Sequence, residues 1–145
     1  MRRLGRLFAL PREDRALLLV ALPLLWGVRL SLWILPFRVV RRGAKALGRR
    51  PSGSGDGTPG QAERIGWAVG SAARFAPDAT CLAQALAAEV LLERRGHTPT
   101  VRMGVVKDEL GKLTAHAWVE SAGRVVIGDH DLDRFTTLEA VDRPV

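Results

Sequence analysis

The sequence is poor in the residues that build covalent and metal-bound cores, with a single cysteine, Cys81, and three histidines among 145 residues. One cysteine excludes an internal disulfide, and no Cys pair or close His–Cys spacing predicts a structural zinc site. No glycine-rich phosphate loop and no cluster of metal ligands is present, so the sequence gives no support for a nucleotide or metal cofactor. No internal repeat is evident. We therefore expect a protein without cofactors in a reducing compartment, for which the cytoplasm is the simplest choice.

The chain is short and strongly basic. Its length fits one compact domain of about 100–150 residues plus an appendage. The formal net charge is +7 and the isoelectric point is about 11.1, so nucleic acid, acidic lipid headgroups and acidic polypeptides all have to be considered as partners. Many of the 22 Lys and Arg residues lie within the first 50 positions. The basic character therefore belongs mainly to the N-terminal segment.

Three zones follow one another along the chain. Residues 1–50 are basic and apolar and predict a helical N-terminal segment. Residues 51–60 predict a flexible linker, because seven of these ten positions are Gly, Ser or Thr. Residues 61–145 form the predicted domain.

A run of thirteen apolar residues, 16–28, dominates the N-terminal segment and is followed by Arg29. A membrane-spanning helix needs about 20 apolar residues, and a charge near its centre costs about 2.5–3.5 kcal/mol, so a full span is disfavoured. The pattern favours a pair of helices kinked near Pro23. These helices either pack on the core, which is the preferred interpretation, or make peripheral contact with a membrane through Trp26 and Trp33.

The period of the apolar residues changes within the predicted domain. A spacing of 3.6 residues predicts helices over residues 61–75 and 81–95, and the second helix is apolar on nearly every side. Alternation with a period of 2 then predicts antiparallel strands near residues 101–105, 113–120 and 124–127. The sequence therefore predicts an α+β fold, in which a buried helix packs on a small antiparallel sheet.

Cys81 falls in the first turn of the buried helix, whether Asp78 or Thr80 is the N-cap residue. The unpaired backbone N–H groups there and the positive end of the helix dipole favour a thiolate. The same groups point to where an oxyanion would form during attack on a carbonyl. A small buried hydrophobic residue is the alternative role of Cys81.

His116 lies in the middle of a predicted strand, on the face that carries Trp118 and Glu120. Such a histidine is either a structural residue or the base that a catalytic thiol requires. A helix N-terminus packed across a sheet brings a first-turn thiol to the middle of a strand. We therefore predict that Cys81 is the nucleophile and that His116 is its base.

The third catalytic residue depends on the register of the last hairpin. If the loop has two residues, Ser121 pairs with Arg124, and His116 then lies directly opposite Asp129. Asp129 would hold the imidazole N–H and fix its tautomer. Asp131, diagonal on the same face, stays open as the second choice, and a loop of another length would change the assignment.

Other polar and aromatic residues are weaker candidates. Gln84 shares a helix face with the cysteine and contacts either substrate or a buried polar network. Trp67 and Trp118 are predicted core or cleft wall. His97 follows a helix C-terminus and His130 points away from Asp129 under the proposed register, so neither histidine is predicted to be catalytic.

Four segments together resemble the transglutaminase-like leader peptidases of lasso-peptide biosynthesis, over roughly residues 61–140. They are Cys81-Leu-Ala-Gln-Ala-Leu, Leu91-Leu-Glu-Arg-Arg-Gly96, Val101-Arg-Met-Gly-Val105 and Ala115-His-Ala-Trp-Val-Glu120, followed by Gly123. The resemblance implies a transglutaminase-like (papain-like) core in which Cys81 and His116 take the catalytic positions. The acid of this family follows the hairpin strand at a variable spacing, which leaves Asp129 open.

The resemblance also implies a function and partners. Such a peptidase removes the leader from a ribosomally made precursor and frees the amine that a separate ATP-using cyclase joins to an Asp or Glu side chain. Residues 1–60 lack the strand-like alternation of a fused leader-binding module. The expected partners are therefore the precursor leader peptide, a separate leader-recognition protein and the lasso cyclase, without nucleic acid.

Two alternatives stay open. In the first, the same residues make a transglutaminase-like acyltransferase, which passes the thioester to an amine rather than to water. In the second, the domain is not an enzyme and acts as a scaffold that docks the precursor, or as a basic module that binds nucleic acid.

Overall fold

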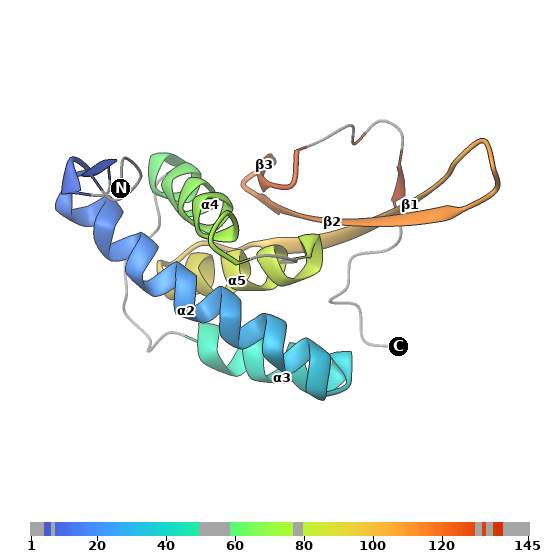
Figure 1. Cartoon of the computed structure of the whole chain (residues 1–145), viewed down its shortest axis with the longest axis horizontal. Helices are drawn as coiled ribbons and strands as arrows, with labels where there is room; N and C mark the ends of the chain where they lie inside the picture. Colours follow the sequence, from blue (N-terminus) through green and yellow to red (C-terminus); the bar gives the residue numbers. More distant parts are fainter. Residues whose placement is uncertain are drawn as a thin grey trace.

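The structure is a computed structural model, and it describes residues 5–6, 8–49, 59–76, 80–129, 132 and 135–137. Among these described residues, four helices precede four strands (Figure 1). The helices are α2 (Arg12–Ile34), α3 (Phe37–Gly48), α4 (Pro59–Ala73) and α5 (Cys81–Arg94), and the strands are β1 (Thr100–Lys107), β2 (Leu113–Ser121), β3 (Arg124–Ile127) and β4 (Thr136–Thr137). This arrangement confirms the predicted fold class.

Helix α5 is the centre of the fold. It contacts the three other helices, α2, α3 and α4, and also the sheet, mainly through β2. Its apolar side chains, among them Leu86 and Leu92, are fully buried. The helix ends in a Schellman motif, since the N–H of His97 donates to the carbonyl of Leu92 at 3.0 Å and Gly96 takes a φ of 85°. The predicted buried helix is thus present with nearly the predicted bounds.

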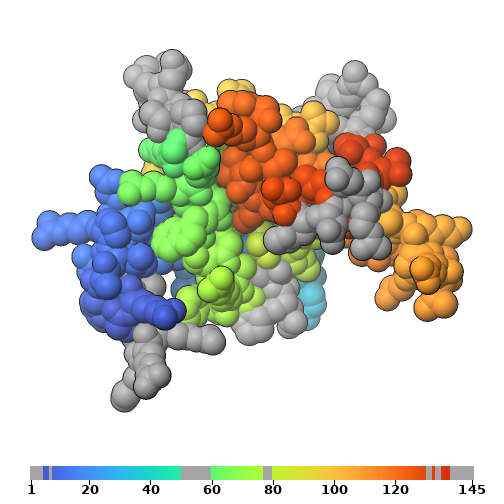
Figure 2. Space-filling view, turned by 90° about the horizontal axis from the view of Figure 1, so that it is seen from above, coloured from blue at the N-terminus to red at the C-terminus, as the bar shows by residue number. Residues whose placement is uncertain are grey.

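The sheet is antiparallel with the strand order β3-β2-β1-β4. The turn between β1 and β2 is closed by Asp108, whose carboxylate accepts from the N–H groups of Leu110 and Lys112. Ala122 and Gly123 join β2 to β3 as a two-residue loop with positive φ at both positions, as predicted for a tight hairpin. Figure 2, viewed from the sheet side, shows β2 and β3 beside α4 and the β1–β2 loop projecting from the rest of the molecule.

The N-terminal segment packs on the core, as the preferred interpretation stated. Helix α2 runs through Pro23 without ending and buries one face against α4 and α5, with Leu25 at the centre of that face. Helix α3, which the sequence did not predict separately, begins after Pro36 and packs on α5. One helix in the described part of the chain, α2, is long and apolar enough to cross a membrane. A core helix of a soluble protein passes the same test, so the finding fixes no location.

The main core cluster joins α2, α3, α4, α5, β1 and β2. Side chains from residues 17–40 therefore share one core with side chains from residues 62–119. Helix α4 begins at Pro59, inside the range predicted for the linker, and residues 51–58 lie outside the described part of the chain.

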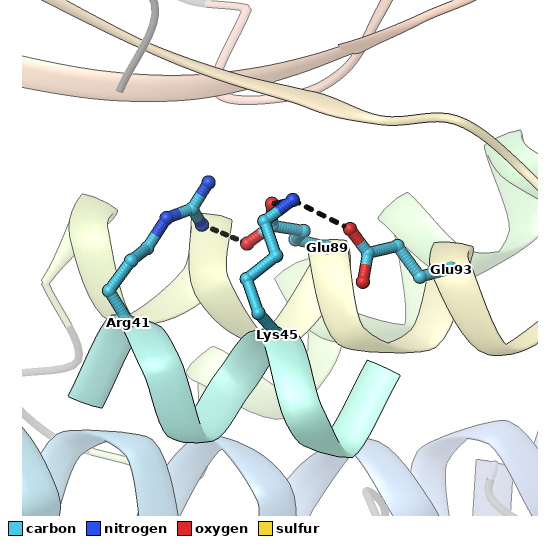
Figure 3. A network of polar contacts seen from close by, with 4 residues as sticks. All are labelled: Arg41, Lys45, Glu89 and Glu93. Carbon is cyan, nitrogen blue, oxygen red and sulfur yellow. Dashed lines mark hydrogen bonds and ion pairs between the residues drawn. The ribbon is translucent and has the colours of Figure 1, made fainter. Parts of the chain in front are cut away.

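A buried ion network joins α3 to α5 (Figure 3). The guanidinium of Arg41 pairs with the carboxylate of Glu89, and Lys45 Nζ lies 3.0 Å from Glu89 Oε1 and 2.8 Å from Glu93 Oε1. Glu89 is only 1% exposed, and this burial raises its pKa against the opposing effect of the two cations. Burial lowers the pKa of Lys45, but hydrogen bonds to Glu93 and Glu89 outweigh it and raise that pKa overall. The two helices are therefore held together by an ion network that is centred on a fully buried carboxylate.

Candidate active site

Cys81 is the first residue of α5 and is half-buried. Thr80 is the N-cap residue, because its hydroxyl accepts a hydrogen bond from the N–H of Ala83 at 3.2 Å. Asp78, the other predicted cap, lies outside the described residues. The first N–H groups of a helix have no partner within it, so those of Cys81 and Leu82 are available to a negatively charged oxygen beside the thiol.

His116 lies in the middle of β2, where it pairs with Gly104 of β1. Its ring stacks on Trp118 at a centroid distance of 6.0 Å and contacts Phe135 at 5.2 Å. His116 Nε2 lies 2.7 Å from the backbone carbonyl oxygen of Gly128. A carbonyl only accepts, so Nε2 carries the hydrogen, and Nδ1 of the neutral ring is left as the proton acceptor.

The register predicted for Asp129 is wrong. Ser121 pairs with Arg124 as predicted, but a bulge then shifts the register, so that Val119 pairs with Ile127, where β3 ends. Asp129 is thus an exposed residue beyond the strand rather than the direct partner of His116. Asp131 lies outside the described residues.

Gly128 takes the position next to the imidazole that the sequence assigned to a carboxylate. Its φ is 88°, and a Cβ at this position would lie 2.8 Å from the Cβ of Trp118. Only glycine fits this conformation without strain, and that conformation directs the carbonyl to His116. In the sequence, the one signal of this role was a glycine directly after the predicted strand over residues 124–127.

The structure brings His116 and Gly128 together and packs the Cys81-bearing helix on the strand of His116. Among the described residues, no hydrogen bond joins the Cys81 thiol to His116. The predicted nucleophile and the predicted base therefore come from two elements in direct contact, and their pairing stays a prediction.

The weaker candidates are distributed as follows. Trp118 is buried, and its indole N–H donates to Glu120 Oε1 at 3.1 Å, so it is a core residue as predicted. Trp67 is 43% exposed on α4 and is not a core residue. Gln84 is half-buried. His97 is a separate case, in which burial lowers the pKa of the imidazole. His130 lies outside the described residues.

A cavity of about 860 Å³ lies beside the N-terminus of α5. Its lining is apolar apart from a few polar groups, and Thr80 places it next to Cys81. The lining residues are Trp26, Gly27, Arg29, Leu30, Leu32, Trp33 and Thr80. In the described part of the chain, no group of three or more His, Cys, Asp or Glu side chains is arranged to hold a metal ion.

Comparison with known proteins gives one match. The family model described as the transglutaminase-like superfamily matches residues 18–140, a range that begins within α2 and includes Cys81 and His116. No curated protein and no solved structure matches the chain.

Proposed function

The chain belongs to the transglutaminase-like superfamily, and on this premise we propose that it is a cysteine peptidase that removes the leader peptide from a ribosomally synthesised lasso-peptide precursor. Members of this superfamily are often cysteine peptidases or acyltransferases. The resemblance of the Cys81, Gly96, Val101 and His116 segments to lasso leader peptidases supports the peptidase and its substrate.

One observation carries the proposal. The only cysteine of the chain begins a helix that packs on the strand of His116, and the Nε2 of that histidine is fixed by the Gly128 carbonyl. Fixing Nε2–H sets the tautomer that leaves Nδ1 free to take a proton. A thiol at a helix N-terminus and an oriented imidazole are the two parts that thiol catalysis needs.

The reaction follows from these parts. The Cys81 Sγ attacks the carbonyl carbon at the leader–core junction, and His116 Nδ1 takes the thiol proton. The N–H groups of Cys81 and Leu82 stabilise the oxyanion. The scissile C–N bond then breaks as His116 gives its proton to the leaving amine of the core peptide, and the leader stays on sulfur as a thioester. Water, deprotonated by His116, hydrolyses this thioester and releases the leader as a carboxylate.

Asp129 is our proposed third member of the triad. It directly follows Gly128, whose carbonyl lies 2.7 Å from His116 Nε2, and we propose that its exposed carboxylate turns toward the imidazolium that forms during the reaction. A negative charge there would stabilise the imidazolium. The exposure of Asp129 predicts a smaller contribution than that of the two other residues.

The proposed partners follow from the same function. We propose that a separate leader-recognition protein presents the precursor, that the lasso cyclase consumes the freed amine, and that the reaction takes place in the cytoplasm. The absence of a disulfide is compatible with that compartment.

Leader removal from the precursor encoded beside the gene tests the proposal, with and without the leader-recognition protein. Cys81→Ala should abolish cleavage and leave the far-UV circular dichroism unchanged, whereas His97→Ala, a histidine outside the site, should keep its activity. Iodoacetamide reports on the thiol alone, since Cys81 is the only cysteine, and fast labelling near neutral pH is expected. Cleavage by a clean preparation of Cys81→Ala would refute the assignment, and sluggish labelling would favour a non-catalytic scaffold.

The superfamily also contains acyltransferases, so transfer of the thioester to an amine is the second candidate. Mass spectrometry of the products separates the two reactions, because transfer adds the mass of the amine to the leader whereas hydrolysis adds that of water.

A further inference from the structure

Helix α2 exposes a continuous apolar stripe on the side that does not face the core. These side chains, which we name the outer apolar face, are Leu19, Val20, Trp26, Leu30, Trp33 and Ile34. Trp33 is 84% exposed and Leu19 is 75% exposed. Soluble proteins rarely expose so large a connected apolar patch unless it binds something.

The outer apolar face is long and contains no charge. At 1.5 Å per residue, the stripe from Leu19 to Ile34 is about 22 Å long, and at 100° per residue it covers an arc of about 140°. Between Leu19 and Ile34 the one charged residue is Arg29, whose guanidinium carbon lies over the Trp26 ring, 5.4 Å from its centroid. A partner for this face must therefore be apolar over a distance of several helical turns.

The charge that follows Leu19 along the chain has one sign, whereas the first turn of α2, before the outer apolar face, carries Glu13 and Asp14. Residues 15–55 contain eight Lys and Arg residues and no Asp or Glu. Arg41 and Lys45 are directed to the carboxylates of α5, but Arg38 and Arg42 of α3 and Arg49, its C-cap residue, are exposed. An apolar stripe followed along the chain by exposed arginines is complementary to an anionic lipid surface, where acyl chains lie below negatively charged headgroups.

We propose that the outer apolar face, together with the exposed arginines of α3, binds the protein peripherally to an anionic membrane, with α2 parallel to the bilayer plane. The two tryptophans would lie at the level of the headgroups, which is the preferred depth of indole rings. A spanning orientation would require α2 to leave the core, where Leu17, Ala21 and Leu25 are buried. Helix α3 lies on the side of α5 opposite the sheet, so the hairpin would face away from the lipid (Figure 1).

The extent of the face favours lipid over a peptide. The cavity beside Thr80 includes Trp26, Leu30 and Trp33, so a peptide bound there would cover only the C-terminal half of the stripe. Leu19 and Val20 lie outside that cavity and would stay exposed to water. A bilayer covers both halves at once.

Co-sedimentation of the full chain with vesicles tests the proposal. Binding is expected with phosphatidylcholine that contains phosphatidylglycerol, and it should weaken without the anionic lipid and when NaCl is raised from about 0.1 M to about 0.5 M. Leu19→Ser and Trp33→Ser should each reduce partitioning about tenfold, since each removes one large apolar side chain. Arg38→Gln and Arg42→Gln should each reduce it about fivefold.

A matched control lies elsewhere on the molecule. Leu110 at the tip of the β1–β2 hairpin is 95% exposed, and Leu110→Ser should bind vesicles as the unchanged protein does. Equal loss in Leu110→Ser and Leu19→Ser would overturn the proposal, as would equal binding to both lipid mixtures. Absence of vesicle binding combined with a peptide effect would also overturn it. In that outcome, measured in the Cys81→Ala background, Trp33→Ser abolishes binding of the precursor peptide and Leu19→Ser does not. The cavity would then be a peptide site. All substituted side chains are exposed, so unchanged circular dichroism is expected.

Discussion

Replacement of Arg41 by methionine is the most direct test of how the N-terminal helices are held to the Cys81-bearing helix. Arg41 is the closest cation to Glu89, a carboxylate that is 1% exposed. Methionine keeps much of the apolar stem of arginine and removes the charge. The variant therefore leaves a buried carboxylate with one partner fewer and little new cavity.

The size of the stability loss depends on which partners Glu89 keeps in the variant. Removal of one member of a buried ion pair costs about 3–5 kcal/mol. Lys45 stays 3.0 Å from Glu89, but its side chain is 38% exposed and shares its charge with Glu93, so it compensates only in part. We expect a loss of about 3 kcal/mol at neutral pH, the lower end of that range. A domain of this size has a total stability of about 5–15 kcal/mol, so the loss is large but leaves a folded protein.

The loss should depend on pH in a defined direction. Burial raises the pKa of Glu89 above the ordinary value of 4.5, and the Arg41 charge opposes this rise. Without Arg41 the pKa rises further, so the folded state binds a proton that the unfolded state has released. An acid with a raised pKa stabilises the folded state at low pH, and this contribution is lost as the pH rises through the folded-state value. The deficit of Arg41→Met should therefore be greatest at neutral pH and should shrink toward pH 4.5.

Urea unfolding followed by far-UV circular dichroism measures these differences. The double variant Arg41→Met with Glu89→Met should recover at least the original stability, because apolar replacement of a whole buried pair is often neutral or stabilising by about 1–4 kcal/mol. Arg42→Met is the matched control, because this neighbouring arginine is exposed and should change stability by no more than about 0.5 kcal/mol. A single variant within about 1 kcal/mol of the original protein, or a double variant that does not recover, would refute the reasoning.

Two further predictions concern the candidate site. Thr80→Ala should lower the free energy of unfolding by about 1 kcal/mol, because the Ala83 N–H loses its cap, and Thr80→Ser should restore it; equal stability of the two variants in urea would contradict the cap. Gly128→Ala should cost about 1–3 kcal/mol, since it places a Cβ against Trp118 in a left-handed conformation. It should also lower the kcat/KM of leader cleavage more than stability alone explains, because the carbonyl that orients His116 moves; unchanged kcat/KM in the folded variant would exclude that role.

The parts of the fold that local signals encode were predictable from the sequence. The apolar surroundings and the terminal Gly96 fixed the bounds of α5 to within one residue, and the Ala122-Gly123 pair marked the tight hairpin. In both cases, the determining interactions lie within a few residues of each other. The placement of Cys81 at a helix N-terminus has the same origin.

The remainder depends on contacts between distant parts of the chain. The bulge that moves Asp129 out of register has no signature in a run of valines, and the carbonyl of Gly128 is a backbone group that side-chain motifs cannot reveal. Arg41, the partner of Glu89, is 48 residues away in the chain. It lies on α3, a helix that was not predicted separately within the basic N-terminal segment. The buried face and the exposed face of α2 are both apolar, so they can be distinguished only when the core against which α2 packs is known.

The position of α2 before α5 in the chain has a consequence for the synthesis of the protein. The ribosome releases this helix about 50 residues before α5, the helix against which much of its inner face packs. Translation proceeds at about 5–20 residues per second, so both apolar faces of α2 stay exposed for several seconds before α5 has been synthesised. During that interval the nascent chain is a substrate for chaperones and for the membrane-targeting machinery, so α2 meets other molecules before the Cys81 thiol has been translated.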